Sequence, residues 1–230
     1  INYNHDMKKS IKTFLKHPTK DSSNRSANPA VIRASTILFN SMQELYQHEK
    51  KIKKNQKISH YSYGRYGSST TIELESMLKE LEQAFHVFLT GTGFGGVALA
   101  LMSLCRPGDE ILVSDNVYGP TKEISEKLLR EFNIIAKFYN PDSFDDLKNK
   151  VSKKTKMILV ENPGSNTFEF QDLSKIVNLA KKKKIFTFLD NTWGTPLYLK
   201  PLKLGFDMSF SSATKYFSGH SDAMGGSLAV

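Results

Sequence analysis

The chain has 230 residues, of which 39% are apolar, and its formal net charge is +9. This length and apolar content suit one large globular domain with a core, or such a domain with appendages. Its single cysteine, Cys105, excludes a disulfide within the chain. The longest apolar run, about ten residues, is too short for a transmembrane helix. We therefore expect a cytoplasmic protein with no membrane partner.

The positive charge comes almost entirely from lysine, because the chain has 27 lysines and five arginines. These lysines are spread over predicted helix faces and tails such as residues 51–54 and 181–184, and no DNA- or RNA-binding pattern accompanies them. We therefore expect no nucleic-acid partner. The six histidines lack the spacing of metal ligands, so we expect no metal site.

Helix and strand patterns follow one another along the chain. Residues 1–60 have weak periodicity, which predicts an N-terminal arm with one helix near residues 41–54. Beyond it, helices are predicted at residues 72–84, 94–105, 121–131, 143–150 and 173–182. Ser143 is the expected N-cap of the fourth of these. Strands are predicted at residues 86–89, 110–113, 134–139, 156–160, 185–189 and 208–211.

Strands that alternate with helices of this length predict an α/β fold with a mostly parallel sheet covered on both faces. In such sheets the ligand site lies beyond the carboxyl ends of the strands. Five residues that follow predicted strands should converge there: Gly91, Asn116, Asn162, Asp190 and Thr214.

Lys215 and Asp190 are the residues that point most directly to a chemistry. Lys215 follows the last predicted strand, with hydroxyl side chains just before it, and Asp190 ends an apolar strand. A lysine amine can hold an aldehyde cofactor as a Schiff base, and nearby hydroxyls can hold its phosphate. A strand-end carboxylate can pair with a protonated pyridine nitrogen. Together these groups predict a pyridoxal 5'-phosphate (PLP) site, whereas a lone lysine would be an ordinary solvated one.

The segment Gly91-Thr92-Gly93-Phe94-Gly95-Gly96 follows a predicted strand and opens a helix, and it has the form G-x-G-x-x-G. By itself this loop indicates only that backbone N–H groups at a helix N-terminus can approach a phosphate. A dinucleotide, a mononucleotide or PLP would suit it equally. A nicotinamide-dependent oxidoreductase is therefore an alternative, although Lys215 and Asp190 favour PLP.

Three longer segments resemble a known family. Residues 190–197 (DNTWGTPL) and 213–222 (ATKYFSGHSD) resemble the PLP enzymes of Cys/Met metabolism. Residues 162–169 (NPGSNTFE) are similar to the loop of the β-lyase branch, where γ-lyases and γ-synthases usually have Asn-Pro in place of Pro-Gly-Ser. The resemblance covers residues 28–230. It implies an aspartate-aminotransferase-type large domain with a mostly parallel sheet, preceded by an N-terminal arm.

The resemblance also implies roles for single residues. Lys215 would be the Schiff-base lysine, Asp190 the partner of the pyridinium nitrogen, and Tyr118 the ring that stacks on the cofactor. The implied phosphate cradle consists of the Ser212 and Thr214 hydroxyls and the backbone N–H groups of Gly93 and Phe94.

Tyr63 and Arg65 resemble a tyrosine–arginine pair that members of this family lend to the phosphate of the neighbouring subunit. The Asn-Pro-Thr that follows this pair in the γ-enzymes is lacking here. The resemblance therefore implies a homodimer or homotetramer in which these two residues act in trans.

The activity implied is that of a carbon–sulfur lyase, which β-eliminates cystathionine to homocysteine, pyruvate and ammonia in methionine biosynthesis. The expected domains are an arm at residues 1–60 and an incomplete PLP-binding large domain at residues 61–230, without the small C-terminal domain. That missing domain would carry the arginine for the substrate carboxylate, so we expect these 230 residues alone not to be a competent lyase. The alternatives are an inactive PLP-binding remnant and a related γ-lyase or γ-synthase.

Overall fold

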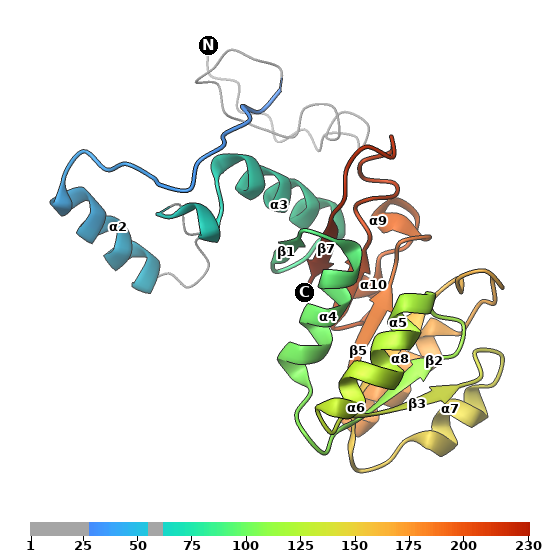
Figure 1. Ribbon diagram of the computed structural model, residues 1–230. Coiled ribbons are helices and arrows are strands. Elements are labelled where there is room, and N and C mark those ends of the chain that lie inside the picture. The colour runs from blue at the N-terminus through green and yellow to red at the C-terminus, as the bar shows by residue number, and fades with distance from the viewer. Residues whose placement is uncertain (1–27, 55–61) are drawn as a thin grey trace. The chain divides into compact units, whose positions relative to one another are not determined.

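The computed structural model describes residues 28–54 and 62–230 (Figure 1). The chain divides into two compact units, Ile1–Met77 and Leu78–Val230. Most of the predicted arm, residues 1–27 and 55–60, lies outside the described residues. The predicted boundary between residues 60 and 61 stays a prediction.

The first unit contains the helix predicted near residues 41–54, which is α2 (Met42–Lys54). Arg65 lies in the short 3-10 helix η1 (Gly64–Tyr66), and its guanidinium group is 5.4 Å from the ring centre of Tyr63. The helix predicted at residues 72–84 is α3 (Ser69–Glu82), which runs from the first unit into the second. It begins earlier than predicted because Ser68 and Thr71 cap it reciprocally, as the Ser68 N–H donates to Thr71 Oγ1 at 2.8 Å.

The second unit is built on a seven-stranded sheet, in the order β1-β7-β6-β5-β4-β2-β3. Its strands are β1 (Val87–Thr90), β2 (Glu110–Ser114), β3 (Ile135–Tyr139), β4 (Thr155–Glu161), β5 (Phe186–Asp190), β6 (Met208–Ser211) and β7 (Gly226–Ala229). Only the two pairings of β7, with β1 and with β6, are antiparallel. The predicted α/β fold with a mostly parallel sheet is confirmed, whereas β7 was not predicted.

Helices connect the strands of this unit. They are α4 (Gly93–Leu104), α5 (Gly119–Glu123), the π-helical turn η2 (Ile124–Leu128), α6 (Leu129–Glu131), α7 (Phe144–Lys150), α8 (Leu173–Lys183), α9 (Thr195–Tyr198) and α10 (Pro201–Leu204). Ser143 caps α7 as predicted, because its hydroxyl accepts the Asp146 N–H at 3.2 Å. The helix predicted at residues 121–131 begins earlier, at Gly119, and contains the π-helical turn.

Apolar side chains cover both faces of the sheet, as predicted. Met157 and Leu159 of β4 belong to the cluster that includes Leu101 of α4. Ile158 and Val160 alternate with them along the strand and belong to the cluster that includes residues of α7 and α8. All four strand residues have no exposed surface. Burying both faces leaves the strand ends as the part of the sheet where polar groups can meet a ligand.

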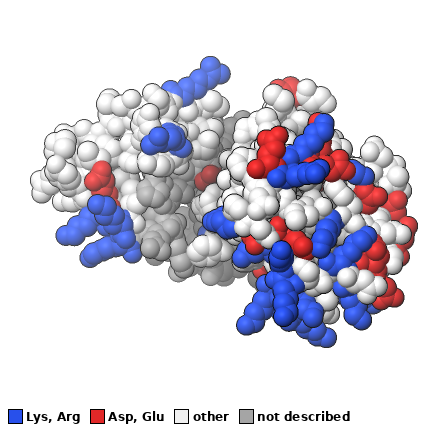
Figure 2. All heavy atoms as spheres, turned by 60° about the horizontal axis from the view of Figure 1, so that its bottom comes forward, with Lys and Arg blue, Asp and Glu red and all other residues white. Residues whose placement is uncertain are grey.

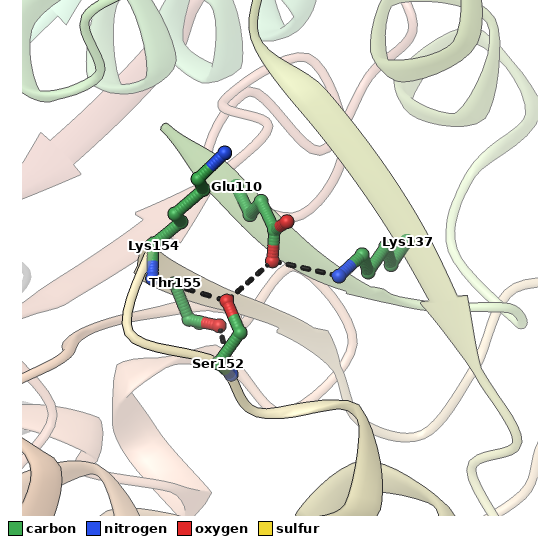
Figure 3. A network of polar contacts seen from close by, with 5 residues as sticks. All are labelled: Glu110, Lys137, Ser152, Lys154 and Thr155. Carbon is green, nitrogen blue, oxygen red and sulfur yellow. Dashed lines mark hydrogen bonds and ion pairs between the residues drawn. The ribbon is translucent and has the colours of Figure 1, made fainter. Parts of the chain in front are cut away.

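At the amino ends of the parallel strands, Glu110 holds three strands together (Figure 3). Its Oε2 accepts from Lys137 Nζ of β3 at 2.7 Å and from Ser152 Oγ at 2.6 Å. Ser152 in turn accepts the Lys154 N–H at 3.0 Å and donates its own N–H to Thr155 Oγ1. The bonds from Lys137 and then Ser152 lower the pKa of Glu110. This network is structural, because it lies at the edge of the sheet opposite the carboxyl strand ends.

Charged side chains of both signs are interleaved on the face shown in Figure 2. Five ion pairs between lysine and a carboxylate are found in the part of the chain described, among them Lys122–Asp115 at 2.5 Å. Within residues 28–54 and 62–230, no helix combines the length and apolar content needed to cross a membrane. Over the same ranges, no three His, Cys, Asp or Glu side chains are grouped so as to hold a metal ion.

Glu82, at the end of α3, has a buried carboxyl group with few hydrogen bonds to offset the cost of its burial. Its exposed fraction is 1%, and its Oε2 accepts from Ser209 Oγ at 3.1 Å. Its Oε1 has no hydrogen-bond partner among the described residues. Burial raises the pKa of Glu82 to about 7, against the hydrogen bond from Ser209 and the charge of Lys200. Ionisation of this carboxyl group therefore disfavours the folded state.

We predict that Glu82→Gln stabilises the protein at about pH 8 and much less at about pH 4, measured as free energy of unfolding in urea. The pKa of Glu82 is higher in the folded state than in the unfolded state. The stability that this difference contributes is therefore fully present below the pKa of the unfolded state, and it is lost as the pH rises through about 7. The gain at high pH should reach up to about 3 kcal/mol. A gain in stability of equal size at both pH values would contradict this explanation, because the gain would then not depend on ionisation of Glu82.

Candidate active site

A cavity of about 450 Å³ opens at the carboxyl ends of the parallel strands, beside the start of α4. Two carboxylates and one lysine line it, together with hydroxyl and aromatic side chains. The lining residues that concern the chemistry are Gly93, Phe94, Tyr118, Glu161, Ser165, Asp190, Thr192, Trp193, Ser212, Thr214 and Lys215. The position agrees with the rule that ligands of parallel α/β sheets bind beyond the carboxyl strand ends.

The start of α4 forms one wall of the cavity. Thr92 is its N-cap, and the Thr92 hydroxyl accepts the Gly95 N–H at 3.0 Å. The N–H groups of Gly93 and Phe94 lie in the first helical turn, where the helix offers them no acceptor. A Cβ on Gly93 would come within 2.7 Å of Ser212 Oγ. Glycine at position 93 therefore lets the start of α4 approach Ser212 closely, so that the N–H groups and this hydroxyl line the same cavity, where they could bind a phosphate.

Gly96, in the first turn of α4, has a different role. A Cβ there would lie 2.7 Å from Cε2 of Phe210, whereas a Cβ on Gly91 would meet nothing within 4 Å. The glycine spacing that resembles a dinucleotide motif is thus explained at Gly96 by close packing of the helix on the sheet.

We predict that Gly96→Ala lowers the free energy of unfolding by about 1–3 kcal/mol, because the buried Phe210 ring has no room to move. The matched control is Gly91→Ala, which places the same methyl group in open space and should change stability by less than about 0.5 kcal/mol. Urea unfolding of both variants gives the comparison. Equal losses would show that the loop backbone, and not the contact with Phe210, requires glycine.

Asp190 is the last residue of β5 and is 8% exposed. Its Oδ1 accepts the Thr192 N–H at 3.0 Å. Burial raises the pKa of Asp190 to about 6, while hydrogen bonds from Thr192 and the positive charge of Lys215 oppose the rise. A buried carboxylate of this kind is stabilised by a cation in the cavity, and a protonated pyridine nitrogen would supply one.

The turn after β6 carries the other polar groups. Lys215 has an exposed side chain at the cavity, and its N–H donates to Ser212 O at 3.0 Å. The Thr214 hydroxyl donates to Gly225 O at 3.3 Å and accepts the Gly225 N–H at 3.1 Å. The proton of Thr214 is therefore already directed to the backbone, so binding a phosphate through Thr214 requires that bond to be exchanged.

Aromatic side chains form the rim of the cavity. Tyr118 precedes α5 and is half exposed, and its N–H donates to Glu161 Oε2 at 2.7 Å. Trp193 also lines the cavity, and Phe168 packs against it edge to face, with the ring centres 5.3 Å apart. Such a rim offers a flat ring of a cofactor or substrate stacking partners and limits its contact with water.

Seven of the predicted site residues line this one cavity: Gly93, Phe94, Tyr118, Asp190, Ser212, Thr214 and Lys215. Their roles toward a cofactor stay predictions. The other two, Tyr63 and Arg65, lie in the first unit, and their action in trans also stays a prediction.

Of the five strand-end residues expected to converge, Asp190 and Thr214 line the cavity. Gly91, Asn116 and Asn162 do not line the cavity among the described residues. The two asparagines instead hold the loop after β4. Asn116 Nδ2 donates to Glu169 Oε2 at 3.2 Å, and Asn162 Oδ1 accepts the Gln171 N–H at 2.6 Å. Their amide groups are used by protein partners.

Of the lining residues named above for their chemistry, four were not predicted as site residues: Glu161, Ser165, Thr192 and Trp193. Glu161 gave a usable signal, because it is an acid at the carboxyl end of an apolar strand, as Asp190 is. The missing information was that β4 and β5 are neighbours, with Glu161 beside Asp190 in the register.

The fold and the cavity define a class of protein. A lysine amine, a buried carboxylate and a helix start that suits a phosphate surround one hollow in an α/β domain, and these are the groups that a PLP site requires. Residues 12–230 match the family described as Cys/Met metabolism PLP-dependent enzyme, and the chain belongs to this family. The predicted family and cofactor are confirmed, and the nicotinamide alternative is not supported.

Known proteins agree with this assignment. Cystathionine beta-lyase of Bordetella avium is 34% identical over 225 residues, which cover 96% of this chain and 56% of that protein. L-alanine/L-glutamate racemase of Wolbachia pipientis wMel is 32% identical over 208 residues, 88% of this chain and 51% of that protein. A solved structure of a protein described as putative O-acetylhomoserine (thiol)-lyase from Campylobacter jejuni contains N'-pyridoxyl-lysine-5'-monophosphate. It is 28% identical in sequence and has a TM-score of 0.81, and the match covers 90% of this chain and 50% of the other. The chain spans about half the length of the curated relatives it matches.

Proposed function

We propose that the chain is the cofactor-binding part of a carbon–sulfur lyase of the cytoplasm, which acts on cystathionine. The overall reaction breaks the bond between sulfur and Cβ, and with one water it yields homocysteine, pyruvate and ammonia. The observation that carries the proposal is the meeting of Lys215 and Asp190 in one cavity. The similarity to cystathionine beta-lyase of Bordetella avium supports the choice of substrate.

Each group of the cavity has a place in this proposal. Lys215 would bind the aldehyde carbon of PLP covalently, and Asp190 would pair with the ring nitrogen. The N–H groups of Gly93 and Phe94, with Ser212, would hold the phosphate, and Thr214 would join them if its bond to Gly225 is exchanged. Tyr118 would lie against the ring. When bound, PLP serves as an electron sink for negative charge at the substrate Cα.

Lys215 would also carry the proton-transfer step. A neutral lysine amine that has been displaced from the aldehyde can take the proton from the substrate Cα. Asp190, when ionised, favours the positive charge on the ring nitrogen, and burial makes this interaction stronger than it would be in water. The Trp193 ring, which lines the cavity and packs against Phe168, would limit the access of water.

The proposal includes a homodimer or homotetramer. In it, Tyr63 and Arg65 of one subunit would reach the phosphate bound by another. A guanidinium group is well suited to this task, because it binds phosphate oxygens through two parallel hydrogen bonds.

The test is pyruvate release from L-cystathionine by the complete gene product that contains these residues, loaded with PLP. We expect steady turnover of about 1 s⁻¹ or more. Formation of cysteine and 2-oxobutyrate instead would assign the γ-lyase reaction. PLP binding without any turnover would support an inactive PLP-binding protein.

A second candidate is racemisation of an amino acid, which the 32% identity to the Wolbachia racemase favours. Racemisation also begins with removal of the Cα proton, so the same Lys215 would serve. The two reactions differ in products, because a racemase converts L-alanine to D-alanine and releases no pyruvate. Incubation with each substrate, followed by chiral analysis and a pyruvate assay, separates them.

A further inference from the structure

Glu161 is the second carboxylate of the cavity. It is the last residue of β4, and it pairs in parallel register with Asp190, the last residue of β5. Only 4% of its surface is exposed. A buried acid is costly unless its oxygens are hydrogen-bonded, so the partners of Glu161 indicate its role.

Both oxygens of Glu161 have partners, and the partners come from two different loops. Oε2 accepts the Tyr118 N–H at 2.7 Å, and Oε1 accepts from Ser165 Oγ at 2.5 Å. Tyr118 lies between β2 and α5, and Ser165 lies in the loop after β4. The carboxyl group thus joins the segment that carries Tyr118 to the floor of the cavity, and Tyr118 and Ser165 both line that cavity.

The charges around Glu161 also bear on its role. The titratable groups that line the cavity with it are Asp190 from β5, Lys215 from the turn after β6, and Tyr118 itself. Burial and then the charge of Asp190 raise the pKa of Glu161 to about 7. Both causes disfavour a negative charge on Glu161, so its hydrogen bonds and not its charge are the feature to test.

We propose that Glu161 is a positioning residue of the cofactor site, which fixes Tyr118 against the place of the PLP ring through the hydrogen bond to the Tyr118 N–H. The inference rests on the proposed cofactor site, but not on the choice of cystathionine as substrate. The role requires an oxygen at the end of a side chain of this length, and it does not require a negative charge.

The first measurement is amide hydrogen exchange at Tyr118 in the protein without cofactor. In Glu161→Ala and Glu161→Asp the Tyr118 amide should exchange at least about tenfold faster, because the acceptor is removed or too short to reach. In Glu161→Gln the amide oxygen still accepts, so protection should persist. The Val117 amide, which donates to Ser114 O at 3.2 Å, is the internal reference and should keep its rate in every variant.

The second measurement is the affinity for PLP, followed by absorbance titration. Glu161→Ala and Glu161→Asp should raise the Kd about tenfold, and Glu161→Gln should leave it close to the wild-type value. Ser165→Ala is the matched control for the other bond. It should leave Tyr118 exchange unchanged, because it removes the partner of Oε1 only.

Unchanged Tyr118 exchange in Glu161→Asp, with the Val117 reference intact, would overturn the inference. So would a Glu161→Gln variant that loses protection or PLP affinity as fully as Glu161→Asp, because charge and not hydrogen bonding would then be at work. Because Asp and Gln differ little in size from Glu, they keep the comparison informative if the alanine variant does not fold. An absence of lyase turnover in the wild type, with the exchange pattern as expected, would count against cystathionine as substrate and leave the role of Glu161 standing.

Discussion

Replacement of Lys215 by alanine is expected to abolish covalent capture of PLP and to lower turnover by at least about 10³-fold. Lys215 is the one lysine among the described residues that line the cavity, so no neighbouring amine can replace it there. Borohydride makes the link between an amine and the aldehyde permanent, and mass spectrometry of the digested protein then identifies the labelled lysine. We expect label on Lys215 in the wild type and none in the variant.

The control for this experiment is Lys183→Ala. Lys183 is an exposed lysine in the last turn of α8, far from the carboxyl strand ends. Its loss should leave labelling and turnover unchanged. Label on any lysine other than Lys215 in the wild type would show that the covalent site has been placed wrongly.

Asp190→Asn is expected to leave PLP bound while slowing exchange of the substrate Cα proton by about 10²- to 10⁴-fold. The amide keeps the size of the side chain and can accept the Thr192 N–H as Asp190 Oδ1 does at 3.0 Å. It cannot carry the negative charge that holds a proton on the ring nitrogen. Deuterium uptake at Cα, measured by mass spectrometry with substrate in heavy water, separates this step from binding.

The matched control is Asp207→Asn, which makes the same change just before β6. Asp207 accepts from Thr187 N and Thr187 Oγ1, both at 2.8 Å, near the amino end of β5. The control should change stability and not the rate of deuterium uptake in folded protein. Equal uptake rates in Asp190→Asn and the wild type would refute the role of Asp190.

The sequence was sufficient where local pattern decides the structure. Apolar strands with flanking amphipathic helices predicted the α/β fold, and the hydroxyl of Ser143 predicted its cap correctly. Residues 226–229, Gly-Ser-Leu-Ala, lack the β-branched and aromatic residues that favour a strand, so β7 was missed. Its conformation is imposed by β1 and β6, between which it lies.

The site was predicted where a residue is needed for its chemistry, as with Lys215 and Asp190. Glu161 was missed because its meaning depends on which strand lies beside β4, and the order of strands in a sheet is not local information. Asn116 and Asn162 follow strand ends as predicted, but their amide groups are used by other partners for a related reason. A residue after a strand can point to the ligand or to a neighbouring loop, and these two asparagines bond to Glu169 and Gln171 of the loop after β4, Asn116 across 53 residues of sequence.

The position of β7 has a consequence for the order in which the protein can fold. The register joins Val87 of β1 to Ala229 of β7, a separation of roughly 140 residues that makes the contact slow to form. Among the described residues, β1 has no strand neighbour other than β7. During synthesis β1 therefore cannot form its native strand pairing until residue 229 has left the ribosome, and until then its backbone groups lack their native partners. We expect nascent chains shorter than this to depend most on chaperones, because an unpaired strand is a template for aggregation.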